Sequence, residues 1–284
     1  MLEDIEGFSV DVSAAGAGSS VIFVHGLGCD QRDWQHQIDA LAGRFRCVSF
    51  DLPGHGNSAN ATEGGLDPLA RVLGGVIVRH GGAGCVLVGH SLGCRLILEA
   101  SNRLSPALLQ SIRGIAFLEQ SLVGGGDAAA VATAVDKLAL RVDSVGIHEF
   151  LRPAFAAMFM PGTDPKLKER VLERLSRLEP RFARELLLSA TAWEARAPEQ
   201  LERLTIPVLL IQSTYLDANF QWNHLVPLKS TPWIDLVRRK VKDCNVEILS
   251  GCGHFSPIEA AEAVNQRLIR FLGSLPSDAR AISR

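Results

Sequence analysis

The sequence predicts an α/β protein with a mostly parallel central sheet flanked by helices. Short apolar runs alternate with helical patterns along much of the chain, and the connections are long enough for crossovers. Of the 284 residues, 47% are hydrophobic, which is enough for one large domain with a substantial core. We assign residues 1–120 and 205–284 to this core. Residues 121–204 are almost entirely helical in pattern, too long for one crossover, and are read as a helical lid inserted over a cleft.

The expected elements follow in order from periodicity. Strands are predicted where short runs are apolar on both faces or alternate, at 8–12, 21–24, 47–50, 86–88, 115–118, 206–211 and 246–249. Helices are predicted where apolar residues recur at helical spacing, at 33–45, 66–80, 94–103, 128–140, 147–160, 166–178 and 182–193.

The strand that ends at Val88 runs straight into Gly89-His90-Ser91-Leu92-Gly93, which a helical stretch follows. A strand, a sharp turn and a helix are the setting of a nucleophile elbow. The two glycines let strand and helix crowd together, and Ser91 stands at the tip of the turn. A serine there becomes reactive when a base takes its proton and N–H donors hold the oxyanion.

Three further motifs follow predicted strands. His25-Gly26-Leu27-Gly28 is a glycine-rich loop that can present N–H groups as oxyanion donors. Asp51 begins a run of turn formers that extends to Ser58. His254 follows the last strand on the glycine-rich loop Gly251-Cys252-Gly253, so its imidazole can reach across the sheet edge. Sites in parallel sheets form at the carboxyl ends of strands, where these motifs lie.

Taken together and in this order, the four motifs resemble the α/β-hydrolase fold family over roughly Val21 to Leu272. The resemblance implies a nucleophile at Ser91, a base at His254 and oxyanion donors on the backbone N–H groups of Leu27 and Leu92. It disfavours haloalkane dehalogenases and epoxide hydrolases, which carry Asp at the elbow.

The acid of the catalytic triad is ambiguous between two carboxylates. Asp217 follows the penultimate strand, the commoner place in the family, but lies about one residue late in a loop without a preceding glycine. Glu119 directly follows the 115–118 strand, a position at which some members of the family carry the acid. A carboxylate at a buried strand end needs a partner to offset desolvation, and a triad histidine supplies one. This argument favours Glu119 and leaves Asp217 open.

Aromatic side chains should line the substrate pocket. Trp222 and Trp233 lie in a stretch, 220–241, that is longer than the family's usual connection and could add a second wall. The residues expected to bind substrate are Trp34, Phe155, Phe159, Trp193 and Trp222, with Met158 beside them.

Composition excludes several classes of partner and site. The net charge of −2 arises from 29 basic and 31 acidic residues spread along the chain, so we expect neither nucleic acid nor a membrane as a partner. The six cysteines lack the paired spacing of a zinc site, and we expect no metal and no cofactor. An acidic start and the lack of a long apolar segment predict a cytoplasmic protein. A homodimer is left open.

These features predict a serine hydrolase that cleaves a small, largely apolar carboxylic ester or lactone through an acyl-enzyme. Two alternatives remain. One is a cofactor-free member of the same fold that uses the histidine and the acid for proton abstraction. The other is a receptor that binds a small molecule without converting it, although a receptor has no need of a Ser–His pair.

Overall fold

The computed structural model describes residues 1–58, 61, 63–217 and 219–276. An eight-stranded sheet with the order β1-β2-β4-β3-β5-β6-β7-β10 forms its centre, and β8 and β9 pair separately as a hairpin. The strands are β1 (Leu2–Ile5), β2 (Phe8–Ala15), β3 (Ser20–Val24), β4 (Arg46–Phe50), β5 (Cys85–His90), β6 (Ile112–Leu118), β7 (Val208–Gln212), β8 (Thr214–Leu216), β9 (Trp222–His224) and β10 (Cys244–Ile248).

The pairing confirms a mostly parallel sheet. From β4 to β10 every neighbouring pair is parallel, whereas β1 with β2 and β2 with β4 are antiparallel. The central strands β3, β5 and β7 are buried along their whole length. They are therefore apolar on both faces, as strands between two helical layers must be.

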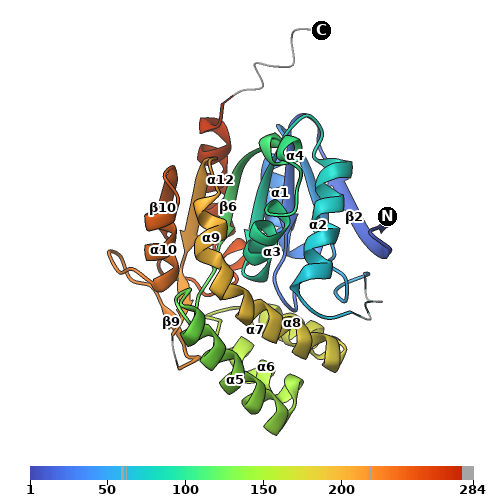
Figure 1. Ribbon diagram of the computed structural model, residues 1–284. Coiled ribbons are helices and arrows are strands. Elements are labelled where there is room, and N and C mark those ends of the chain that lie inside the picture. The colour runs from blue at the N-terminus through green and yellow to red at the C-terminus, as the bar shows by residue number, and fades with distance from the viewer. Residues whose placement is uncertain (59–60, 62, 218, 277–284) are drawn as a thin grey trace, which may run out of the picture.

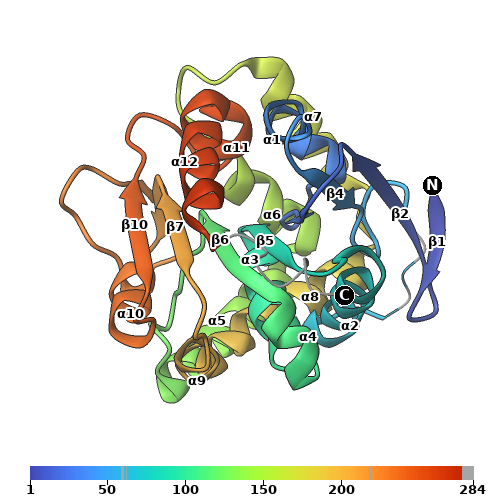
Figure 2. The same ribbon diagram turned by 90° about the horizontal axis from the view of Figure 1, so that it is seen from above.

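Helices cover both faces of the sheet (Figure 2). One layer holds α1 and α12, which pack side by side, and the other holds α2, α3 and α10. The helices of the core are η1 (Gln31–Trp34, 3-10), α1 (Gln35–Leu41), α2 (Leu66–His80), α3 (Leu92–Ser101), α4 (Pro106–Ser111), α9 (Ala197–Glu202), α10 (Pro232–Lys240), α11 (Ser256–Glu259) and α12 (Ala261–Ser274).

Between β6 and β7 the chain forms a group that we call the inserted helices. Figure 1 shows α5 to α8 gathered beyond one end of the sheet. Their bounds are α5 (Ala128–Val145), α6 (Ile147–Ala156), α7 (Pro165–Ser176), α8 (Pro180–Ala192) and η2 (Trp193–Arg196, 3-10). That they act as a lid stays a prediction.

A buried ion-pair cluster ties the inserted helices to the core. Arg174 in α7 lies 2.9 Å from Asp30 and 2.9 Å from Asp33, which flank the start of η1. Although burial opposes it, Arg32 and Arg174 hold the pKa of the Asp30 carboxyl well below its usual range. The cluster fixes α7 against the loop that follows β3.

The stretch after β7 contains structure that periodicity did not predict. It forms the β8–β9 hairpin and helix α10 in place of a long loop. Trp233 in α10 is fully buried against Phe117 of β6, with ring centroids 5.7 Å apart, so it belongs to the core and does not form a pocket wall. None of the helices in the described part of the chain is both long and apolar enough to cross a membrane.

Helix α3 crosses the strand ends at very short range. A Cβ atom at Gly93 would lie 2.2 Å from the carbonyl oxygen of Val24 in β3, and one at Gly89 would lie 2.8 Å from the carbonyl carbon of Gly93. Backbone atoms cannot yield as a flexible side chain can. The glycines therefore fix how closely α3 follows β5.

We predict that Gly93→Ala lowers the free energy of unfolding by about 1–3 kcal/mol or more, because the added methyl group forces backbone apart. Gly273→Ala is the matched control, since a Cβ in this position of α12 meets nothing within 4 Å and should leave stability unchanged or slightly raised. Urea unfolding followed by circular dichroism measures both. A Gly93→Ala variant as stable as the wild type would contradict the account.

Candidate active site

Ser91 occupies a strained turn between β5 and α3. Its backbone has φ 54° and ψ −115°, a region that residues with a side chain rarely adopt. The N–H of Ser91 donates to the carbonyl of Leu118 in β6 at 2.9 Å, which holds the turn against the sheet. The conformation lifts the hydroxyl out of the strand and leaves the side chain partly exposed.

Ser91 opens into a cavity between the sheet and the inserted helices. The cavity has a volume of about 140 Å³. Engineered apolar cavities of about this volume bind benzene. Its walls are mostly apolar side chains from α6 and α8, and His254 and Glu119 complete its floor. A small, largely apolar group fits such a space.

The two candidate oxyanion donors border the same cavity. Leu27 follows β3 and Leu92 begins α3, and both line the space in front of Ser91. Neither backbone N–H donates a hydrogen bond to another described residue. The N–H of Leu92 belongs to the first turn of a helix, whose dipole favours negative charge. Both groups are available to a ligand oxygen.

His254 is held in place by contacts on several sides. Its N–H donates to the carbonyl of Met158 at 2.8 Å, and its own carbonyl accepts from His90 Nε2 at 2.8 Å. The Trp222 ring packs against the imidazole with centroids 4.5 Å apart. No hydrogen bond joins Ser91 to His254 among the described residues, although both line the cavity; such bonds often form only once substrate is present.

A threonine that the sequence analysis missed connects His254 to Glu119. Thr214 Oγ1 lies 3.2 Å from His254 Nδ1 and 3.1 Å from Glu119 Oε2. A hydroxyl has one proton to donate, and Glu119 in its ionised form can only accept it. The hydroxyl therefore donates to Glu119 and accepts from Nδ1–H, which leaves His254 Nε2 as the acceptor. A hydroxyl between base and acid leaves no sequence pattern, so only the fold reveals it.

Glu119 is fully buried, and its backbone adopts a left-handed conformation. Its φ is 59°, and its Oε2 also accepts from the backbone N–H groups of Ser213 at 3.0 Å and Thr214 at 3.1 Å. Burial raises the pKa of Glu119 to about 7, against the lowering effect of the Ser213 N–H. Burial and the neighbouring His90 hold the pKa of His254 well below its usual value. The imidazole is therefore neutral at pH 7, as a base must be.

Asp217 has a different setting. It begins the turn of the β8–β9 hairpin, where Oδ1 accepts from the N–H groups of Asn219 at 2.9 Å and Gln221 at 3.0 Å. Its Oδ2 accepts from Asn223 Nδ2 at 3.1 Å. These bonds lower the pKa of the Asp217 carboxyl. The carboxylate organises the hairpin that carries Trp222.

The predicted aromatic residues divide into two groups. Phe155 and Trp222 line the cavity, as does Met158. Trp34, Phe159 and Trp193 lie outside its lining and are buried in the interior. Trp34, the last residue of η1, packs on Phe23 with centroids 5.1 Å apart. Phe159 stacks on Phe255 with centroids 4.5 Å apart, and Trp193 Nε1 donates to Gln200 Oε1 at 2.8 Å. Helical periodicity shows that such residues face inward but not whether they face core or cavity.

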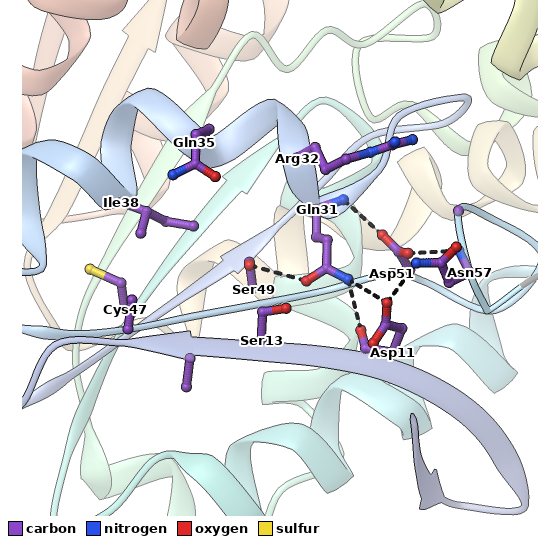
Figure 3. Close-up of a pocket in the computed structure, with 13 residues that line it drawn as sticks. Asp11, Ser13, Gln31, Arg32, Gln35, Ile38, Cys47, Ser49, Asp51 and Asn57 are labelled. Atoms are coloured by element: carbon purple, nitrogen blue, oxygen red, sulfur yellow. Dashed lines mark hydrogen bonds between the residues drawn. The ribbon is translucent and has the colours of Figure 1, made fainter. Parts of the chain in front are cut away.

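A second, larger cavity of about 340 Å³ lies at the edge of the sheet and shares no lining residue with the first. Figure 3 shows that its polar side chains bind one another. Asp51 accepts from the N–H groups of Gln31 at 2.8 Å and Asn57 at 2.7 Å, and Asp11 accepts from both side-chain amides. The Asp51 motif thus secures the loop after β4 and takes no part in the Ser91 cavity.

No group of three or more metal-ligating side chains is found within the described ranges. The six cysteines are all unpaired thiols. The polar groups that border the cavity include a hydroxyl, an imidazole and a carboxylate, those of Ser91, His254 and Glu119. This set suits attack on a carbonyl carbon.

Comparison with known families gives a match over residues 21–267 to a model described as the alpha/beta hydrolase family. A curated relative from Pseudomonas putida, the dihydrolipoyllysine-residue acetyltransferase component of an acetoin cleaving system, is 29% identical over 90% of this chain. The chain spans only 64% of that protein's length. A 2-succinyl-6-hydroxy-2,4-cyclohexadiene-1-carboxylate synthase from an Enterobacter species is 36% identical over 28% of this chain and 30% of its own length.

Solved structures with the same architecture include an enol-lactonase from Burkholderia xenovorans, with a TM-score of 0.73 and 17% identity over 96% of this chain and 100% of that one. A thermophilic esterase from Thermogutta terrifontis has a TM-score of 0.70 and 19% identity, over 94% of this chain and 93% of that one. At these identities the likeness establishes the fold.

Proposed function

Because the chain belongs to the alpha/beta hydrolase family, we propose that it is a serine hydrolase that cleaves a small, largely apolar carboxylic ester or lactone without a cofactor. One observation carries the proposal: Ser91, strained to a positive φ, and His254 line one mainly apolar cavity together with Leu27 and Leu92, whose backbone N–H groups have no partner among the described residues. The esterase and enol-lactonase folds named above support the same class of substrate.

In the proposed reaction Ser91 Oγ attacks the carbonyl carbon while His254 Nε2 takes its proton. The N–H groups of Leu27 and Leu92 hold the oxyanion. His254 then returns the proton to the departing alcohol, which leaves an acyl group on Ser91. Water, deprotonated by His254, attacks this ester and frees the acid, and the proton returns to Ser91.

The same proposal assigns Glu119 as the acid and Thr214 as a positioning residue. As His254 gains a proton, its Nδ1–H is held by the Thr214 hydroxyl, which in turn donates to the Glu119 carboxylate. The buried negative charge stabilises the imidazolium through this relay. Because a cation is costly in so buried a site, the base depends on Glu119.

We predict that Ser91→Ala lowers hydrolysis of p-nitrophenyl butyrate by on the order of 10⁴-fold or more while the circular dichroism spectrum is unchanged. The side chain lies at the tip of a turn and contributes little packing. Turnover within tenfold of the wild type would contradict the nucleophile and favour proton abstraction by His254 in its place.

Glu119→Gln and Asp217→Asn form a matched pair that preserves size and removes charge. We predict a loss in kcat on the order of 10³-fold or more for Glu119→Gln, because the imidazolium loses its counter-charge. Asp217→Asn should stay within about threefold of wild type, since its role is in the hairpin. A larger loss for Asp217→Asn, measured with the same ester, would reverse the assignment.

Thr214→Val keeps the shape of the side chain and removes the hydroxyl. We expect a fall in kcat of about tenfold or more with little change in KM, because the relay between His254 and Glu119 is broken. Thr214→Ser restores the hydroxyl and should recover most of the rate. Equal rates for the valine and serine variants would show that the hydroxyl is not used.

The size of the cavity should set the preferred acyl length. Phe155→Ala opens one wall, and each further buried methylene gains roughly 0.8 kcal/mol, or about fourfold in kcat/KM, so longer p-nitrophenyl esters should be favoured. Trp193→Phe is the control, because Trp193 lies outside the lining and should leave the preference unchanged. The same length profile in wild type and Phe155→Ala would place the acyl pocket elsewhere.

A further inference from the structure

One part of the Ser91 cavity is polar although most of its lining is apolar. Arg95 lies one helical turn after Ser91 in α3, and Gln120 follows Glu119 at the end of β6; both line the cavity. The Arg95 side chain is 13% exposed and Gln120 is 2% exposed. The hydrolysis steps given above use neither residue.

The hydrogen bonds of Gln120 fix the orientation of its amide. Its Oε1 accepts from Arg95 Nε at 3.4 Å and from the backbone N–H of Ser121 at 2.9 Å. Both partners are donors, so the atom they meet must be the oxygen. The other amide atom, Nε2, is buried and has no hydrogen-bond partner among the described residues. Such an orphaned donor is uncommon in a protein interior and marks a place where an acceptor is missing.

Arg95 also keeps one unused donor. Its Nη2 donates to the carbonyl of Ser121 at 2.8 Å and to Glu194 Oε1 at 3.1 Å, its Nη1 donates to the carbonyl of Ala190, and its Nε donates to Gln120. A guanidinium has five N–H groups. One hydrogen on Nη1 therefore has no acceptor within the described part of the chain.

The charge of Arg95 is already balanced. Glu194 is 1% exposed, and its Oε2 accepts from the N–H groups of Val123 at 2.8 Å and Gly124 at 2.9 Å, while Oε1 pairs with Arg95. A second anion beside this pair would be buried without a counter-charge, which is costly. The two free donors therefore suit a neutral acceptor, the oxygen of a carbonyl or hydroxyl group.

We propose that Arg95 and Gln120 form a subsite that binds a neutral carbonyl or hydroxyl oxygen on the acyl chain of the substrate. The inference rests on the proposed function, because it places the acyl group on Ser91. Arg95 and Gln120 line the same cavity as Ser91, so the bound oxygen belongs to the part of the acyl chain that extends from the reacting carbonyl into this cavity. The substrate class is thus narrowed from a plain alkanoate to an oxo- or hydroxy-substituted acyl ester or lactone.

The test compares two p-nitrophenyl esters that differ in one oxygen, the 4-oxopentanoate and the pentanoate. Wild type should prefer the oxo ester in kcat/KM by about tenfold or more, since a buried donor finds its partner. Gln120→Met keeps the length of the side chain and removes the Nε2 donor without adding a charge, so most of the preference should be lost. Thr191→Val is the control: this side chain lines the cavity, but its hydroxyl already donates to the carbonyl of Leu187. Its preference should equal that of wild type.

Binding to Ser91→Ala separates the two proposals. Methyl 4-oxopentanoate should bind this variant about tenfold more tightly than methyl pentanoate in calorimetric titrations. Selective binding without any ester hydrolysis by wild type would support the subsite and refute the hydrolase. Hydrolysis of both esters without preference, together with equal binding, would overturn the subsite and leave the hydrolase intact.

Discussion

The close approach of α3 to the ends of β3 and β5 determines where Ser91, the N–H of Leu92 and Arg95 lie. Glycine at positions 89 and 93 allows this approach, because a Cβ at either position would meet backbone atoms within 3 Å. The chain can turn from strand to helix in so little space only by forcing Ser91 to φ 54°. The same turn leaves the N–H of Leu92 without a partner among the described residues, and Arg95, one turn later, lines the cavity. Strain of this kind costs on the order of 1–3 kcal/mol, and it persists because the surrounding packing and hydrogen bonds hold the residue in place.

Burial governs the chemistry of the site. His254 and Glu119 are both shielded from solvent, so each charged form is disfavoured, and the pKa of the base falls while that of the acid rises. The hydroxyl of Thr214 lies between the two groups and links them. The inserted helices α6 and α8 supply much of the apolar wall of the cavity. Arg174 in α7 attaches the inserted helices to the loop after β3.

The sequence was a good guide to the sheet and a partial guide to the site. Apolar runs identified the parallel strands β3, β4, β5, β6, β7 and β10. The Gly-x-Ser-x-Gly motif identified the turn at Ser91. Both signals are local patterns in the sequence. The β8–β9 hairpin was missed because its strands are short and half exposed. Trp193 and Phe155 both sit on the apolar side of helices, and only tertiary packing turns one toward the core and the other toward the cavity. Thr214 escaped notice for the same reason, since its role depends on two partners distant in sequence.

The central claim is that Ser91 is a nucleophile activated by His254. Incubation with a fluorophosphonate probe, followed by intact-mass and peptide mass spectrometry, tests this claim most directly, because the probe bonds covalently only to an activated serine. The account predicts one probe per chain on the peptide that contains Ser91, with labelling strongly slowed in a variant that lacks the His254 imidazole. An unlabelled Ser91 in correctly folded protein would contradict the account.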